Sequence, residues 1–89
     1  MKTILIVYKL DEGVEYSVIA KQIRSYSNWA KVMERVWMIK TTKTTAIVRD
    51  EIRGTIDGKG KVLVIDISSQ GWGSYNLPKE VTTWMKENM

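Results

Sequence analysis

The side chains that most often carry enzyme chemistry are missing from this sequence. Its 89 residues include no cysteine and no histidine. Zinc sites built on these residues, and nucleophile pairs of the Ser-His or Cys-His type, therefore cannot form within the chain. The lack of cysteine also excludes disulfides and favours a reducing, cytoplasmic compartment.

Acidic residues are the remaining candidates for metal chemistry. Asp11 and Glu12 follow an apolar run, and paired carboxylates of this kind can hold Mg²⁺. Two adjacent acids are also typical of a solvated turn, which is the interpretation we favour. We therefore expect no catalytic residue, no metal and no cofactor. If the chain were a metal-dependent endonuclease or endoribonuclease, Asp11, Glu12 or Asp66 would carry the reaction with Mg²⁺.

Basic residues outnumber acidic ones by 14 to 10, which gives the chain a net charge of +4. A positive surplus favours polyanionic partners such as DNA or RNA. The candidate nucleic-acid-binding residues are Lys9, Lys21, Arg24, Arg49 and Arg53. All but Lys9 fall on the polar sides of two predicted helices. If these helices share one layer, their charges form a basic face that contacts phosphates without reading sequence. An ordinary solvated helix surface is the alternative.

The hydrophobic pattern predicts the elements that position these residues. The apolar run over residues 2–8 predicts a buried strand, and a stripe at helical spacing predicts a helix from Tyr16 to Tyr26. Residues 29–41 favour β structure throughout but are too many for one strand in so small a chain. We therefore expect a tight reversal at Glu34-Arg35 that divides this stretch into two strands.

The second half of the chain repeats this order of elements. A second helix is predicted over residues 44–53, with Thr44 or Thr42 as its cap and Gly54 at its end. Residues 61–67 form the last strand. A third helix follows Pro78, because proline is favoured in a first helical turn.

Two successive strand-helix-strand units define the expected fold. They predict an α+β domain over residues 1–89, a ferredoxin-like βαββαβ antiparallel sheet with an additional C-terminal helix. The two main helices cover only one side of such a sheet, although its central strands are apolar on both. Either the third helix or a second protomer must cover the other side. The residues assigned to the core or to a dimer face are Trp37, Ile39, Val64, Trp72 and Trp84. No apolar run is long enough to span a bilayer, so no membrane partner is expected.

Four stretches of the chain match the pattern of a known family. They are Ile4-Leu5-Ile6-Val7-Tyr8, Met33-Glu34-Arg35-Val36-Trp37-Met38-Ile39-Lys40-Thr41, Val62-Leu63-Val64-Ile65-Asp66 and Thr83-Trp84-Met85-Lys86-Glu87-Asn88. In these stretches the chain resembles the small SinR-like bacterial proteins. That family is related to the CRISPR-associated adaptation protein numbered two and, more distantly, to the VapD ribonucleases.

The resemblance implies a ferredoxin-like fold that dimerises through its sheets. In the CRISPR branch, such dimers bridge an integrase and hold duplex DNA. Some members are metal-dependent nucleases that use an aspartate directly after the tyrosine that ends the first strand. Here Tyr8 is followed by Lys9, so that ligand is missing, and Asp11 lies two residues further on.

Three functions follow from these observations. The first, which we favour, is a non-catalytic homodimeric module with weak, sequence-independent nucleic-acid binding in CRISPR-related or other phage-host defence. The second is a metal-dependent endonuclease or endoribonuclease. The third is an adaptor whose exposed tryptophans and edge strands recruit a larger protein.

Overall fold

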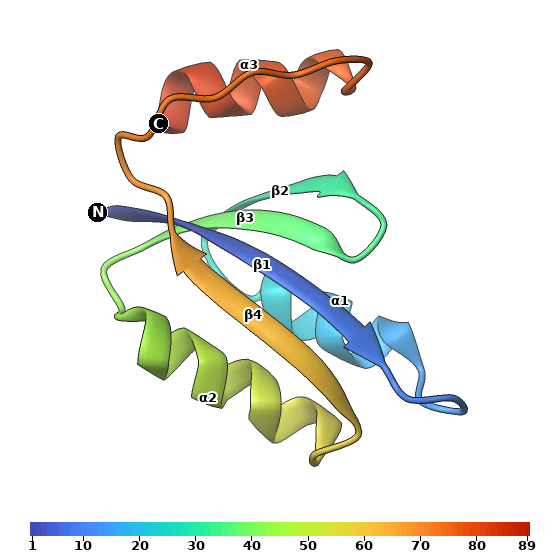
Figure 1. Cartoon of the computed structure of the whole chain (residues 1–89). Coiled ribbons are helices and arrows are strands. Elements are labelled where there is room, and N and C mark those ends of the chain that lie inside the picture. Colours follow the sequence, from blue (N-terminus) through green and yellow to red (C-terminus); the bar gives the residue numbers. More distant parts are fainter.

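A four-stranded antiparallel sheet lies between two helices on one face and a third helix on the other (Figure 1). The computed structural model describes all residues 1–89. In chain order the elements are β1 (Lys2–Leu10), α1 (Tyr16–Arg24), β2 (Asn28–Met33), β3 (Val36–Thr41), α2 (Thr45–Ile56), β4 (Gly60–Asp66) and α3 (Lys79–Asn88). The expected α+β class and the C-terminal helix are confirmed.

The strands are ordered β2-β3-β1-β4, with β1 in the interior of the sheet. β1 pairs antiparallel with β3, where Ile4 lies opposite Ile39, and with β4, where Leu5 lies opposite Ile65. An interior strand has no edge toward solvent, and this suits the continuous apolar run of β1. β2 and β4 are the two edge strands.

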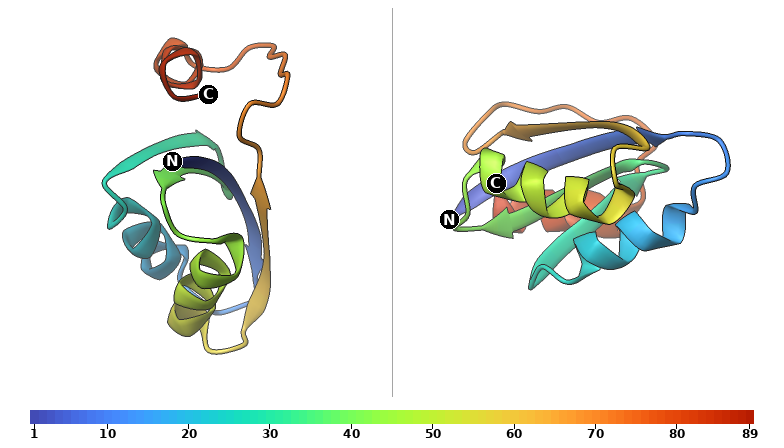
Figure 2. Two further views of the ribbon diagram at one scale, coloured as in Figure 1. Left: turned by 90° about the vertical axis from the view of Figure 1, so that its left-hand side faces the viewer. Right: turned by 90° about the horizontal axis from the view of Figure 1, so that it is seen from below.

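The main core lies between the sheet and helices α1 and α2 (Figure 2). Alternate residues of β1 point into it, as the two-residue period of a strand requires. The twelve buried members of this cluster are Ile4, Ile6, Tyr8, Leu10, Ile19, Ile23, Tyr26, Trp37, Ile39, Val48, Ile52 and Ile56. Trp37 and Ile39 are therefore core residues, and Val64 packs against the cluster while partly buried.

α3 covers part of the opposite face of the sheet. Its buried residues Val81 and Met85 pack on Val32 of β2 and Met38 of β3, forming a second, smaller cluster. The C-terminal end of α3 is held by hydrogen bonds, because the Asn88 carbonyl accepts from the Thr3 hydroxyl and from the Lys40 ammonium. The sequence left open whether the third helix or a second protomer covers this face. In the structure the third helix of the same chain covers part of it.

Two of the predicted local features are present, the reversal between β2 and β3 and the cap of α2, and the predicted end of α2 is not. The reversal at Glu34-Arg35 is present, with Arg35 at a φ of 65°. Thr44 caps α2, since its hydroxyl accepts a hydrogen bond from the Ile47 amide. The predicted end of that helix at Gly54 is wrong. α2 continues to Ile56, which is buried one helical turn after Ile52, so burial of this apolar stripe outweighs the low helix propensity of glycine.

None of the three helices is long and apolar enough to cross a membrane.

Candidate nucleic-acid interface

The five predicted nucleic-acid-binding residues divide between the two faces of the molecule. Lys21 and Arg24 of α1, and Arg49 and Arg53 of α2, are all exposed in the helix layer. α1 and α2 pack against each other on the same face of the sheet (Figure 2), so these four cations all belong to the helix layer. Lys9 is exposed and alternates with buried residues of β1, so its side chain lies on the opposite sheet face.

The positive charge of α2 is partly neutralised within the helix. Asp50 lies 3.0 Å from the Arg49 guanidinium and 3.7 Å from that of Arg53. The hydrogen bond from Arg49 holds the pKa of Asp50 below its ordinary value. Two guanidiniums therefore share one carboxylate, leaving one surplus charge. In contrast, Lys21 and Arg24 of α1 take part in no ion pair.

A second acid on α2 has a structural role. Glu51 accepts hydrogen bonds from the Tyr26 hydroxyl at 2.6 Å and from the Lys43 ammonium at 2.7 Å. The bond from Lys43, followed by that from Tyr26, lowers the pKa of Glu51, while burial raises the pKa of Tyr26. This clamp ties the segment after α1 to α2 and engages Lys43, so Lys43 is not a free cation.

Lys9 has a basic neighbour that the sequence analysis missed. Lys61 of β4 lies directly opposite Lys9 of β1 in the antiparallel register, and both side chains are exposed. Neither forms an ion pair. The sequence places Lys61 at the start of the last predicted strand, residues 61–67, but does not show which residue lies opposite it. The pairing of the two lysines depends on the register of β1 against β4, which the sequence does not give.

The candidate metal ligands are not brought together. Asp11 and Glu12 are exposed in the turn after β1, next to Leu10, which pairs with Gly60. Asp66 ends β4 at the other end of the sheet, roughly 20 Å away at about 3.3 Å per strand residue. Its carboxylate accepts two hydrogen bonds from Ser68, and these lower its pKa. No three acidic, histidine or cysteine side chains gather into a metal site.

The outer face of the sheet beside α3 remains uncovered. Leu63 and Ile65 of β4 are 57% and 41% exposed, and Val7 of β1, opposite Leu63, is partly exposed. We call Val7, Leu63 and Ile65 the open strip. Trp72, assigned by sequence to the core or a dimer face, belongs to neither apolar cluster and is 38% exposed. It is not a core residue, because it lies in the irregular segment between β4 and α3.

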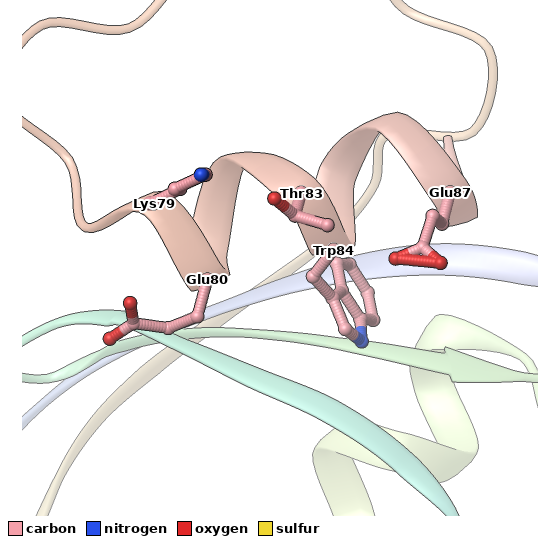
Figure 3. Close-up of a pocket in the computed structure, with 5 residues that line it drawn as sticks. All are labelled: Lys79, Glu80, Thr83, Trp84 and Glu87. Carbon is pink, nitrogen blue, oxygen red and sulfur yellow. The ribbon is translucent and has the colours of Figure 1, made fainter.

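A surface hollow lies along α3 (Figure 3). It measures about 430 Å³ and is lined by Lys79, Glu80, Thr83, Trp84 and Glu87. Trp84 points from α3 toward the sheet, where its indole N–H donates a hydrogen bond to Asn28 at 2.7 Å. Trp84 therefore anchors α3 to β2. The two glutamates make this hollow unsuitable for phosphate, since its only cation is Lys79.

Comparison with known protein families, curated proteins and solved structures found no match to this chain.

Proposed function

We propose that this chain is a non-catalytic homodimeric module of ferredoxin-like type that binds nucleic acid weakly through its backbone phosphates. The strand order β2-β3-β1-β4, with α1 and α2 on one face, supports the ferredoxin-like assignment. The resemblance to SinR-like proteins supports a cytoplasmic role in CRISPR-related or other phage-host defence.

The exposure of the open strip is the main observation in favour of a dimer. Leu63 and Ile65 expose large apolar side chains on an edge strand whose outer backbone groups have no partner in the chain. Exposed apolar edge strands favour association, and soluble proteins normally cover or blunt them. A second copy related by a two-fold axis presents the same strip and so covers it with a self-complementary surface.

The unpaired cations of the helix layer support nucleic-acid binding. Lys21 and Arg24 have no acidic partner, and Arg49 with Arg53 retains one surplus charge beside Asp50. Contacts to backbone phosphates carry no sequence information, so the proposed binding is independent of sequence. It also weakens steeply with salt, because each phosphate contact releases condensed counterions.

Light scattering tests the dimer. The wild type is expected at twice the chain mass of 10.3 kDa at micromolar concentration. Leu63→Asp places a charge in the open strip and is expected to give a monomer. The matched control, Val18→Asp, alters an apolar residue of α1 that is also exposed, and it should remain dimeric. A monomeric wild type would contradict the dimer.

Binding at low salt tests the nucleic-acid contacts. Reversing Lys21, Arg24, Arg49 and Arg53 to glutamate is expected to abolish retention of DNA and RNA on filters. A control that reverses Lys2, Lys59, Lys79 and Lys86 changes the net charge equally but leaves the helix layer intact, so it should retain more. Equal retention by the wild type and the helix-layer variant would remove nucleic acid from the proposed function.

A further inference from the structure

The cross-strand pair Lys9–Lys61 is electrostatically unfavourable as it stands. Directly opposite residues of an antiparallel pair have Cβ atoms about 4.5–5.5 Å apart, and like charges there destabilise the sheet. Both lysines are exposed, and every ion pair of the protein involves other residues. An anion that bridged the two ammonium groups would remove the repulsion and gain attraction to both.

The surroundings of the pair indicate where an anion would lie. A hollow of about 240 Å³ is lined by Val7, Tyr8, Lys9, Lys61, Val62 and Leu63. The two lysines are its only charged groups. On the turn side, a neighbouring hollow of about 270 Å³ also includes Asp11 and Glu12, whose carboxylates repel anions. The favourable position is therefore the first hollow, on the side of the two lysines. Lys9 and Lys61 lie beyond Val7 and Leu63 at the end of the open strip, and so at the rim of the proposed dimer interface.

We propose that Lys9 and Lys61 form a phosphate-binding pair on the outer face of the sheet, and that it holds a backbone phosphate of a nucleic acid. The identity of the ligand rests on the proposed function; the site itself is new and lies on the face opposite α1 and α2. A polymer backbone suits this position better than an enclosed small molecule, because both lysines are solvent-exposed. Lysine ammonium groups bind phosphate as point charges and need no fixed fork geometry.

The test compares two double variants that remove the same amount of charge. Lys9→Gln/Lys61→Gln removes the sheet pair, and Lys21→Gln/Arg24→Gln removes two cations from the helix layer. Both lower the net charge of +4 by two units, so long-range attraction changes equally. The affinity for a labelled duplex oligonucleotide is measured by fluorescence anisotropy between about 50 and 200 mM salt.

Loss of two phosphate contacts has a defined effect on this salt dependence. The slope of log affinity against log salt should fall by about 1.8 in Lys9→Gln/Lys61→Gln, at about 0.9 per contact. Raising the salt over the stated range weakens the binding of both proteins. The factor by which it does so should be about ten times smaller for this variant than for the wild type. Lys9→Arg/Lys61→Arg preserves both charges and should bind like the wild type, which distinguishes the charge from any effect on folding.

Three outcomes separate this inference from the proposed function. A wild-type slope in Lys9→Gln/Lys61→Gln would overturn the phosphate pair, and the nucleic-acid function would stand if the helix-layer variant lost binding. Loss of binding in Lys9→Arg/Lys61→Arg would also overturn the pair, because charge would then not explain the effect. If the wild type bound no oligonucleotide but inorganic phosphate shifted the Lys9 and Lys61 ammonium resonances, the proposed ligand would be wrong.

Discussion

Trp37 and Tyr8 form the central polar contact of the main core. The indole N–H of Trp37 donates to the Tyr8 hydroxyl at 2.9 Å, and both side chains are buried. Burial raises the pKa of Tyr8, although the hydrogen bond from Trp37 opposes that shift. Burial of Trp37 was predictable from the apolar pattern of residues 29–41. Its hydrogen bond was not, because it depends on which residue of β1 lies beside it.

Truncating Trp37 should be among the most damaging single changes. Trp37→Ala leaves a large cavity and is expected to lower the free energy of unfolding by about 3–5 kcal/mol. Tyr8→Phe should cost about 1–3 kcal/mol, because it leaves the buried indole N–H without an acceptor. Urea denaturation measures both. Trp72→Ala is the control, since Trp72 is exposed; an equal loss in the control would contradict this account.

The candidate site was partly predictable at the residue scale. The alternation of apolar residues on two helices was enough to place Lys21, Arg24, Arg49 and Arg53 in one layer. The ion pairs of Asp50 follow from helical spacing, yet they become evident only once the rotamers are seen. Lys61 could not be assigned without the register of β1 and β4, because a shift of one residue would place it on the other face.

At the scale of elements, the hydrogen bonds of Glu51 hold two connecting segments against α2. They link the segment after α1, through Tyr26, and the segment before α2, through Lys43, to α2 itself. Element types were predictable because their hydrophobic periods differ. The position of α3 was not, since a stripe formed by Val81 and Met85 fits either its own sheet or a partner.

The clamp should make stability depend on pH in the acid range. The pKa of Glu51 lies below its ordinary value of 4.5 in the folded protein. Its stabilisation is therefore present above that value and is lost as the pH falls through the folded pKa. On acidification the free energy of unfolding should therefore fall more in the wild type than in Glu51→Gln. The difference should be less than about 1 kcal/mol, because the Lys43–Glu51 pair is partly exposed. Thermal unfolding from neutral pH to about pH 2 measures the difference; Glu87→Gln, which alters an exposed acid outside any ion pair, should follow the wild type.

For the whole molecule, the distance between its candidate acidic residues argues against metal-dependent catalysis. A metal-dependent phosphodiesterase needs carboxylates that converge on one cation. Asp11 and Glu12 lie at one end of the sheet and Asp66 at the other. Lys9, which directly follows Tyr8 in β1 and precedes Asp11 and Glu12 by two and three residues, would repel a metal ion at that end of the sheet.

We therefore expect the protein to cut neither RNA nor DNA, single- or double-stranded, in the presence of Mg²⁺ or Mn²⁺. Gel electrophoresis after prolonged incubation is the assay. Cleavage that disappears in Asp11→Ala/Glu12→Ala would contradict this expectation. Cleavage that persists in the variant would instead identify a contaminating nuclease.

The interior position of β1 also constrains the order in which the protein folds. Its partners are distant in sequence: Ile4 pairs with Ile39, and Leu5 pairs with Ile65. Only the β2–β3 hairpin is local, so folding depends on closing long loops and should be slower than in a helical bundle of equal size. β4 closes the longest loop and has a neighbour on one side only. Among the strands, its amides should therefore exchange fastest with deuterated water, and those of β1 and β3 slowest.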